Sequence, residues 1–131
     1  MTSNLKIIRV RDFIKAAPQG TLDMAKASQA VLEASLVPGV FVSYDLLIDT
    51  RGAESDLSVT DIWHLAKDLA RIVQNNTKGF RAKIPVLCPT KEFDLAKFFE
   101  LCSQNRGLNV RAFTSFEDLF QWLSEPSEVS T

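Results

Sequence analysis

Glycine, cysteine and histidine are scarce in this sequence of 131 residues, and each shortage disfavours a class of function. The five glycines, at positions 20, 39, 52, 79 and 107, form neither a Gly-rich phosphate loop nor a GxGxxG pattern, which disfavours nucleotide chemistry. Two cysteines and one histidine supply no recognised zinc-ligand spacing, so we expect no metal and no other cofactor. The cysteines are also too few for a disulfide framework, which predicts reduced thiols in a cytoplasmic protein.

Long apolar runs and an excess of charge of one sign are also missing. No window reaches the ~18 apolar residues of a membrane span, and the first residues lack the apolar core of a signal peptide. We therefore expect a cytoplasmic protein without integral membrane association. Fifteen Lys and Arg against sixteen Asp and Glu leave a net charge of -1, so we expect no nucleic-acid partner.

The length and the 46% hydrophobic content predict one domain with its own core. We place this domain at residues 1–124 and a flexible tail at residues 125–131, because the tail shows no apolar periodicity. Strand-like and helix-like segments alternate along the domain. We expect strands at 5–10, 41–49, 81–89 and 108–113, with Phe13–Ile14 extending or neighbouring the first.

Helices are expected at 22–36, 58–76, 93–107 and 115–123. The first is assigned from Leu22, Ala25, Gln29, Leu32 and Leu36 at helical spacing, with Thr21 or Asp23 as its cap. Pro85 predicts that its strand lies near a sheet edge or carries a bulge. The alternation indicates an α/β fold in which a mostly parallel sheet of four or five strands is covered by about four helices.

Ligands of parallel sheets bind beyond the carboxyl ends of the strands, which directs attention to the loop after the strand at 41–49. In this loop Asp49, Thr50, Arg51 and Gly52 form a candidate site for an anion or a protein partner. Ser58 follows, with Asp61 three residues later, as a helix cap or a phosphoacceptor. The alternative is that Asp49 and Arg51 only close a turn and Ser58 only caps.

Catalysis is the least favoured function. His64 is the sole imidazole and lies at the flank of an apolar helix face, which favours a structural or surface role. Cys88 stands at the end of a strand, where either a nucleophile or an inert buried thiol fits. Cys102 falls on an apolar helix side and is expected in the core. We therefore predict no enzyme, with a thiol-dependent enzyme as the third alternative.

Two further clusters have simple explanations. The basic run Arg71, Lys78, Arg81 and Lys83 is interpreted as solvated loop charge, and Asn105–Arg106 with Arg111 as a helix end. Nine phenylalanines suggest a carrier of a small apolar or lipid-like ligand, although core packing also explains them. A lipid carrier needs a cavity of roughly several hundred Å³ lined by these rings. The rings in question are Phe93, Phe98, Phe99, Phe113, Phe116 and Phe120.

Four segments carry a resemblance that covers nearly the whole chain, from about Asp12 to Leu123. They read DFIKAAPQGTLD, YDLLIDTRGAESDLSVTDIWHLAKDLA, FRAKIPVLCP and FDLAKFFELCSQNRGLNVRAFTSFEDLFQWL. The sequence resembles the small bacterial SpoIIAA-like domains of the STAS and CRAL-TRIO type, most of which are uncharacterised.

The resemblance implies a non-enzymatic STAS-like module that regulates a protein partner, with binding of a small apolar ligand as the alternative. In regulatory STAS domains a serine at the start of the helix after the central strand is phosphorylated, and Ser58 is the nearest positional match. The DSSG-like phrase of those domains is replaced here by LSVTD. The partner is an unidentified protein, and a homodimer through an edge strand is also compatible with the sequence.

Overall fold

A four-stranded parallel sheet organises the part of the chain that the computed structural model describes, residues 12–76 and 82–125. Its strands lie in the order β1 (Phe13–Ala16), β3 (Asp45–Asp49), β5 (Lys83–Leu87) and β6 (Asn109–Phe113). The α-helices of the described residues are α1 (Met24–Ser35), α2 (Val59–Asn76), α3 (Phe93–Gln104) and α4 (Phe116–Ser124). The predicted α/β class is confirmed, whereas the expected strand at 5–10 and tail residues 126–131 lie outside the described residues.

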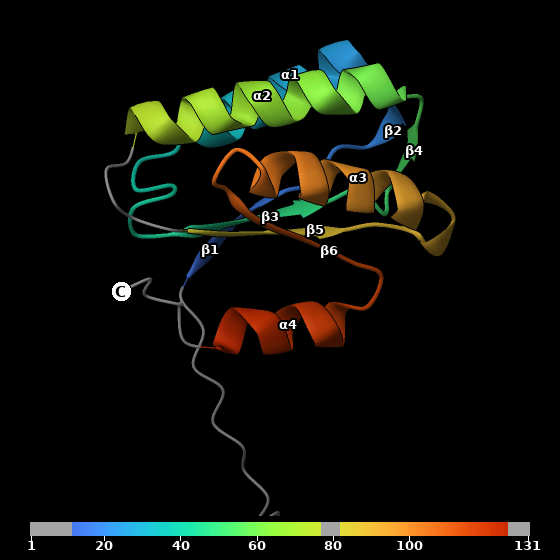
Figure 1. Cartoon of the computed structure of the whole chain (residues 1–131). Coiled ribbons are helices and arrows are strands. Elements are labelled where there is room, and N and C mark those ends of the chain that lie inside the picture. Colours follow the sequence, from blue (N-terminus) through green and yellow to red (C-terminus); the bar gives the residue numbers. More distant parts are fainter. Residues whose placement is uncertain (1–11, 77–81, 126–131) are drawn as a thin grey trace, which may run out of the picture.

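The strand order determines where the helices lie. Because crossovers between parallel strands are right-handed, strands that follow one another in chain order carry their crossover helices on one face of the sheet. Figure 1 shows α1, α2 and α3 on one face and α4 alone on the other. A sequential order also means that the four described strands contain no point where the order reverses, which is where open α/β sheets usually bind ligands.

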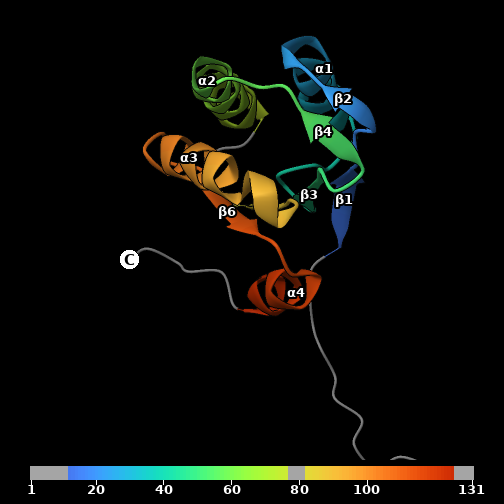
Figure 2. The ribbon, with the colours of Figure 1, turned by 90° about the vertical axis from the view of Figure 1, so that its right-hand side faces the viewer.

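A second, two-stranded parallel sheet was not expected from the sequence. It pairs β2 (Gly20–Leu22) with β4 (Ala53–Ser55), a segment predicted to be a polar loop. These strands follow directly on β1 and β3, so they continue the chain beyond the carboxyl ends of the main sheet, next to α1 (Figure 2). Three-residue strands carry too little alternation to be recognised in sequence.

Two strand predictions need correction. The strand expected at 41–49 starts only at Asp45, because Gly39 accepts hydrogen bonds from the backbone N–H groups of Val42, Ser43 and Tyr44 in a tight turn. Pro85 lies in a central strand, not at an edge, since β5 pairs with both β3 and β6. Its register with β3 begins one residue later, at Val86, so the missing N–H removes no bond there.

The predicted inner face of the first helix is also wrong. Leu32 and Leu36, chosen for their spacing, are 54% and 73% exposed. Asp23 does provide the cap, accepting a hydrogen bond from the N–H of Lys26 (2.9 Å). The face toward the sheet is made by Ala27, Ala30, Val31 and Ala34, which line the space beneath the helix.

The face covered by α4 is held by a smaller apolar cluster and a buried lysine. Leu119, Trp122 and Leu123 of α4 pack on Leu47 and Leu87 of the sheet. The Lys83 ammonium donates to the carbonyls of Trp122 (2.7 Å) and Glu125 at the end of α4. A cation at this position interacts favourably with the carbonyl groups at the C-terminal end of a helix.

Candidate functional site

A cavity of about 100 Å³ lies between the sheet and its three crossover helices. Apolar side chains from β3, β5, α1, α2 and α3 form nearly all of its wall, and it is partly open to the surface. Four of the lining residues have polar side chains, and they lie at or beyond the carboxyl ends of the strands. These four, the polar end of the cavity, are Thr50, Ser55, Cys88 and Glu92.

Small side chains on α1 explain why the space is not filled. Ala27, Ala30 and Ala34 follow the i, i+3, i+7 spacing of one helix face, so this face presents methyl groups where a core helix normally presents larger side chains. Below them Ile48 of the central strand β3 is only half-buried, although its neighbours on that strand are buried. The alanine face therefore creates the cavity.

The polar end is built on a contact between β4 and the start of α3. The backbone N–H of Ser55 donates to Oε2 of Glu92 (3.0 Å), and the N–H of Leu57 donates to the Ser55 hydroxyl (3.3 Å). The Thr50 hydroxyl donates to the carbonyl of Leu87 (3.2 Å). Glu92 lies at the N-cap of α3, where the helix dipole stabilises a carboxylate.

Cys88 is an unreactive thiol in this arrangement. It is 2% exposed, and its Sγ lies 3.6 Å from the carbonyl oxygen of Phe113. Burial, with the negative charge of Glu92 as a smaller cause, raises the pKa of Cys88 to about 11. The thiol therefore stays protonated at neutral pH, in agreement with the expected buried thiol. Cys102 is buried in the core, also as expected.

In the loop predicted as an anion or partner site, the charged side chains of Asp49 and Arg51 pair with each other. Asp49 is 6% exposed and accepts from the N–H of Arg51 (3.0 Å), from Arg51 Nε (3.0 Å) and from its terminal nitrogen (2.9 Å). Lys15 adds a cation 3.5 Å from Asp49. These bonds, with that to the Arg51 side chain the largest cause, hold the pKa of Asp49 below its ordinary value. Thr50 and Gly52 are tied by backbone bonds to Leu87 and Gly20.

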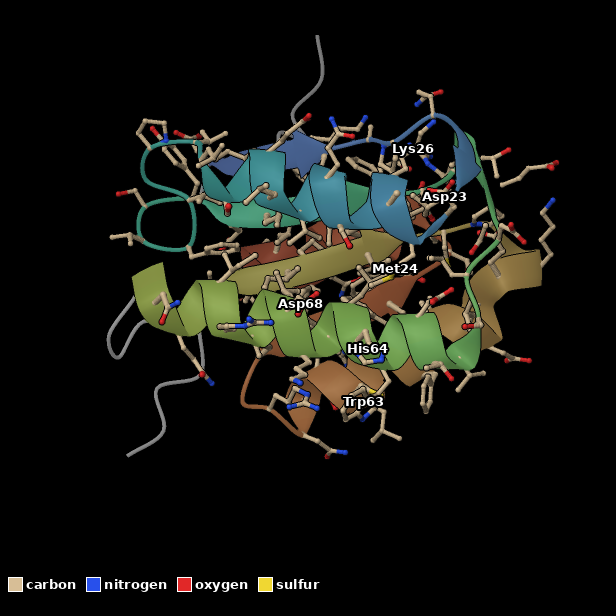
Figure 3. All side chains as sticks on the ribbon, turned by 90° about the horizontal axis from the view of Figure 1, so that it is seen from above. Asp23, Met24, Lys26, Trp63, His64 and Asp68 are labelled. Carbon is tan, nitrogen blue, oxygen red and sulfur yellow. The ribbon has the colours of Figure 1, made fainter. Side chains whose placement is uncertain are left out.

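Ser58 forms the predicted capping box at the start of α2. Its hydroxyl accepts from the N–H of Asp61 (3.1 Å), and the Asp61 carboxylate accepts from the N–H of Ser58 (3.0 Å). Ser58 is exposed, and the side chains of Val59 and Trp63 nearby are 59% and 43% exposed. Figure 3 shows Trp63 on the side of α2 that faces away from α1.

The other residues considered from the sequence, His64, Arg106 and Arg111, lie next to tryptophan rings and do not line the cavity. His64 is exposed and packs edge-on against the Trp63 ring at 5.1 Å, away from the cavity. Arg106 lies over the Trp63 ring (5.0 Å) and Arg111 over the Trp122 ring (5.9 Å).

The basic run does not form solvated loop charge throughout. Lys83 is 4% exposed, which corrects that interpretation for this residue, because its ammonium holds the end of α4. Arg71 pairs with Asp68 on α2. Lys78 and Arg81 lie outside the described residues.

The phenylalanines do not build the cavity. Of the six rings in the last third of the chain, only Phe99 lines it. Its volume is also below the several hundred Å³ that a lipid requires. The sequence signal for the cavity was instead the alanine spacing on α1 together with Glu92, neither of which was singled out. Across the described ranges no three His, Cys, Asp or Glu gather as a potential metal site, and no helix is long and apolar enough to cross a membrane.

Comparison with known proteins identifies the fold. No protein-family model and no curated protein matches the sequence. Among solved structures, the chain is similar to an uncharacterized protein from the DUF3478 family of Shewanella loihica PV-4, with a TM-score of 0.50 and 19% identity. The match covers 94% of this chain and 98% of that protein, which is described as having a SpoIIAA-like fold. The described part of the chain therefore has the SpoIIAA-like fold that the sequence resemblance predicted.

Proposed function

We propose that this protein is a non-catalytic binding domain whose cavity takes a small apolar ligand. The observation that carries the proposal is the cavity of about 100 Å³ with an almost wholly apolar wall beneath α1. Apolar cavities stay dry, and an engineered cavity of about 150 Å³ binds benzene. The volume therefore suits a ligand with a chain of a few carbons, which is smaller than the lipid-like ligand considered from the sequence.

The absence of a catalytic role is part of the proposal. A nucleophilic cysteine needs a thiolate and a neighbouring base. Cys88 is buried with its pKa raised to about 11, and His64 does not line the cavity. In a Cys102→Ser variant, which leaves Cys88 as the sole thiol, we expect a thiol reagent at pH 8 to modify less than about a tenth of the folded protein in an hour. Rapid modification of the folded variant would argue for an enzyme.

Filling the cavity tests ligand binding directly. Ala30→Leu places extra carbons in the cavity, whereas Ala25→Leu places the same carbons on the exposed side of α1. We expect 1-hexanol to shift backbone amide NMR signals of cavity residues in the wild type and in Ala25→Leu, and to bind Ala30→Leu at least about tenfold more weakly. Equal binding to all three proteins, or binding to none of them, contradicts the proposal.

A second candidate function, a regulatory cytoplasmic module for a protein partner, is supported by the surface at the start of α2. Val59 and Trp63 are exposed apolar side chains four residues apart, so they share one helix face beside Ser58. Isolated exposed apolar residues are common, but aromatic residues are enriched at the centres of interfaces.

Recovery of partners from the native host tests this second function. We expect Trp63→Ala and Ser58→Glu to lower recovery of a partner at least about tenfold, because truncation of a central aromatic and a charge beside Asp61 both change the surface. Leu36→Ala is the matched control, since Leu36 is an exposed apolar residue at the other end of the helical layer. Recovery of every protein at wild-type levels by both α2 variants excludes the surface.

A further inference from the structure

The cavity contains one charged side chain. Among the described residues that line it, Glu92 alone carries a formal charge at neutral pH, and no lysine, arginine or histidine is present. The other polar groups at this end are the two hydroxyls and a protonated thiol. A ligand that fills the apolar part therefore reaches a single carboxylate at the polar end.

The Glu92 carboxylate accepts one hydrogen bond from the backbone and has no paired cation among the described residues. Oε2 accepts from the N–H of Ser55 (3.0 Å), and the start of α3 adds partial positive charge. Within the described ranges, no Lys, Arg or His nitrogen lies within 4.0 Å of the Glu92 carboxylate. The neighbouring Lys91 instead points to Glu54, with 3.9 Å between the ammonium and the carboxylate. The backbone thus stabilises the charge without neutralising it.

The chemistry of this end distinguishes between ligand head groups. An ammonium group beside a carboxylate forms a charge-assisted hydrogen bond, which is about twice as strong as a neutral one. A carboxylate ligand would place two negative charges together, and no cation of the cavity wall would offset them. A hydroxyl also donates to the carboxylate but carries no charge of its own, so it lacks the ion-pair attraction that an ammonium group adds.

We propose that the cavity is a site for short-chain primary amines, with the alkyl chain beneath α1 and the ammonium group at Glu92. This inference rests on the proposed function, because it names the chemical class of ligand for the same cavity. A linear chain of about four to six carbons matches a volume somewhat below that of a benzene site.

A matched series of ligands tests the head group. Hexylamine, 1-hexanol and hexanoate each have six carbon atoms and differ in charge, and NMR titration gives a Kd for each with the wild-type protein. We expect hexylamine to bind about tenfold more tightly than 1-hexanol and hexanoate to bind most weakly, because only the ammonium group adds an ion-pair attraction to its hydrogen bond with the carboxylate. This order is measured without any substitution, so it does not depend on a variant that folds.

Two variants locate the effect. Glu92→Gln keeps an oxygen that accepts from Ser55 but removes the charge, and we expect it to bring the Kd of hexylamine to within about threefold of that of 1-hexanol. Glu54→Gln removes an equal charge from a side chain that is 85% exposed and does not line the cavity. We expect Glu54→Gln to keep the preference for the amine.

The outcomes separate the two proposals. Equal binding of the three ligands to the wild type, or an unchanged preference for the amine in a folded Glu92→Gln protein, overturns the assignment to amines and leaves the apolar cavity as a binding site. Failure of all three ligands to bind overturns the proposed function itself.

Discussion

The helices α1 and α2 lie side by side over the same face of the sheet but fill the space beneath them differently (Figure 3). The inner face of α2 carries Ile62, Leu65 and Leu69, each at most 6% exposed, together with Ala66 at 0%; of these, Ile62 and Leu65 are large side chains that also form part of the cavity wall. The inner face of α1 carries three alanines and one valine above the cavity. Of these two neighbouring helices, α2 therefore contributes large side chains to the core, whereas the small side chains of α1 leave a cavity beneath it.

Removing a large side chain gives the largest expected contrast. Leu69→Ala on α2 is expected to lower the free energy of unfolding by about 2–5 kcal/mol, because Leu69 is fully buried among filled neighbours. Val31→Ala on α1 removes carbons that already border the cavity, so we expect a loss of about 1 kcal/mol or less. Urea denaturation of both variants measures the difference, and equal losses would show that α1 is packed as tightly as α2.

Enlarging a small side chain gives the opposite test. Ala66→Leu forces carbons into a filled core and is expected to cost about 1–3 kcal/mol. Ala30→Leu enters the cavity and is expected to change the free energy of unfolding by less than about 1 kcal/mol in either direction. The same urea experiment applies. A loss from Ala30→Leu as large as that from Ala66→Leu would contradict the alanine face as the origin of the cavity.

The N-terminal caps of the two helices are expected to be nearly equivalent. Asp23 on α1 and Ser58 on α2 each accept a hydrogen bond from an N–H three residues later. Asp23→Ala and Ser58→Ala should each lower the free energy of unfolding by about 1 kcal/mol. Thermal unfolding followed by circular dichroism compares them. A negligible effect of Ser58→Ala would remove the structural role of the box and strengthen the case for another role of this serine.

The smallest effect is expected on the outer side of α1. Leu32→Ser should change the free energy of unfolding by no more than about 0.5 kcal/mol, because this side chain is 54% exposed. Leu65→Ser on α2 serves as the contrast, since it places a hydroxyl at a site that is 6% exposed. A large loss from Leu32→Ser would mean that the exposed leucines of α1 are covered in solution.

The same contrast shows what sequence reasoning reaches. The inner face of α2 can be recognised in the sequence because its large apolar residues repeat with the helical period. The method failed on α1 because leucine was weighted above alanine, although Ala27, Ala30 and Ala34 have an equally regular spacing. The existence of both helices, and of the sheet beneath them, followed from the alternation alone.

The candidate site was harder to predict for a physical reason. Polar residues beyond a buried strand often bind ligands, which is the basis of the prediction for the loop at 49–52; Thr50 of this loop lines the cavity, whereas Asp49 pairs with Arg51 and Lys15. The cavity forms where side chains are too small to fill the space between α1 and the sheet. The contact at its polar end joins Glu92 to Ser55, which are 37 positions apart in the chain. The contact has no local pattern in sequence, and the alanine spacing on α1 does not by itself distinguish a helix over a filled core from a helix over a cavity.

The pairing order of the strands has a consequence for how the chain acquires its shape during synthesis. Each described strand that joins a sheet pairs with one that the ribosome has already made: β3 with β1, β4 with β2, β5 with β3 and β6 with β5. No described strand has to insert between two that are already paired. The sheet can therefore grow by addition at one edge as the polypeptide emerges, with α4 closing the opposite face last.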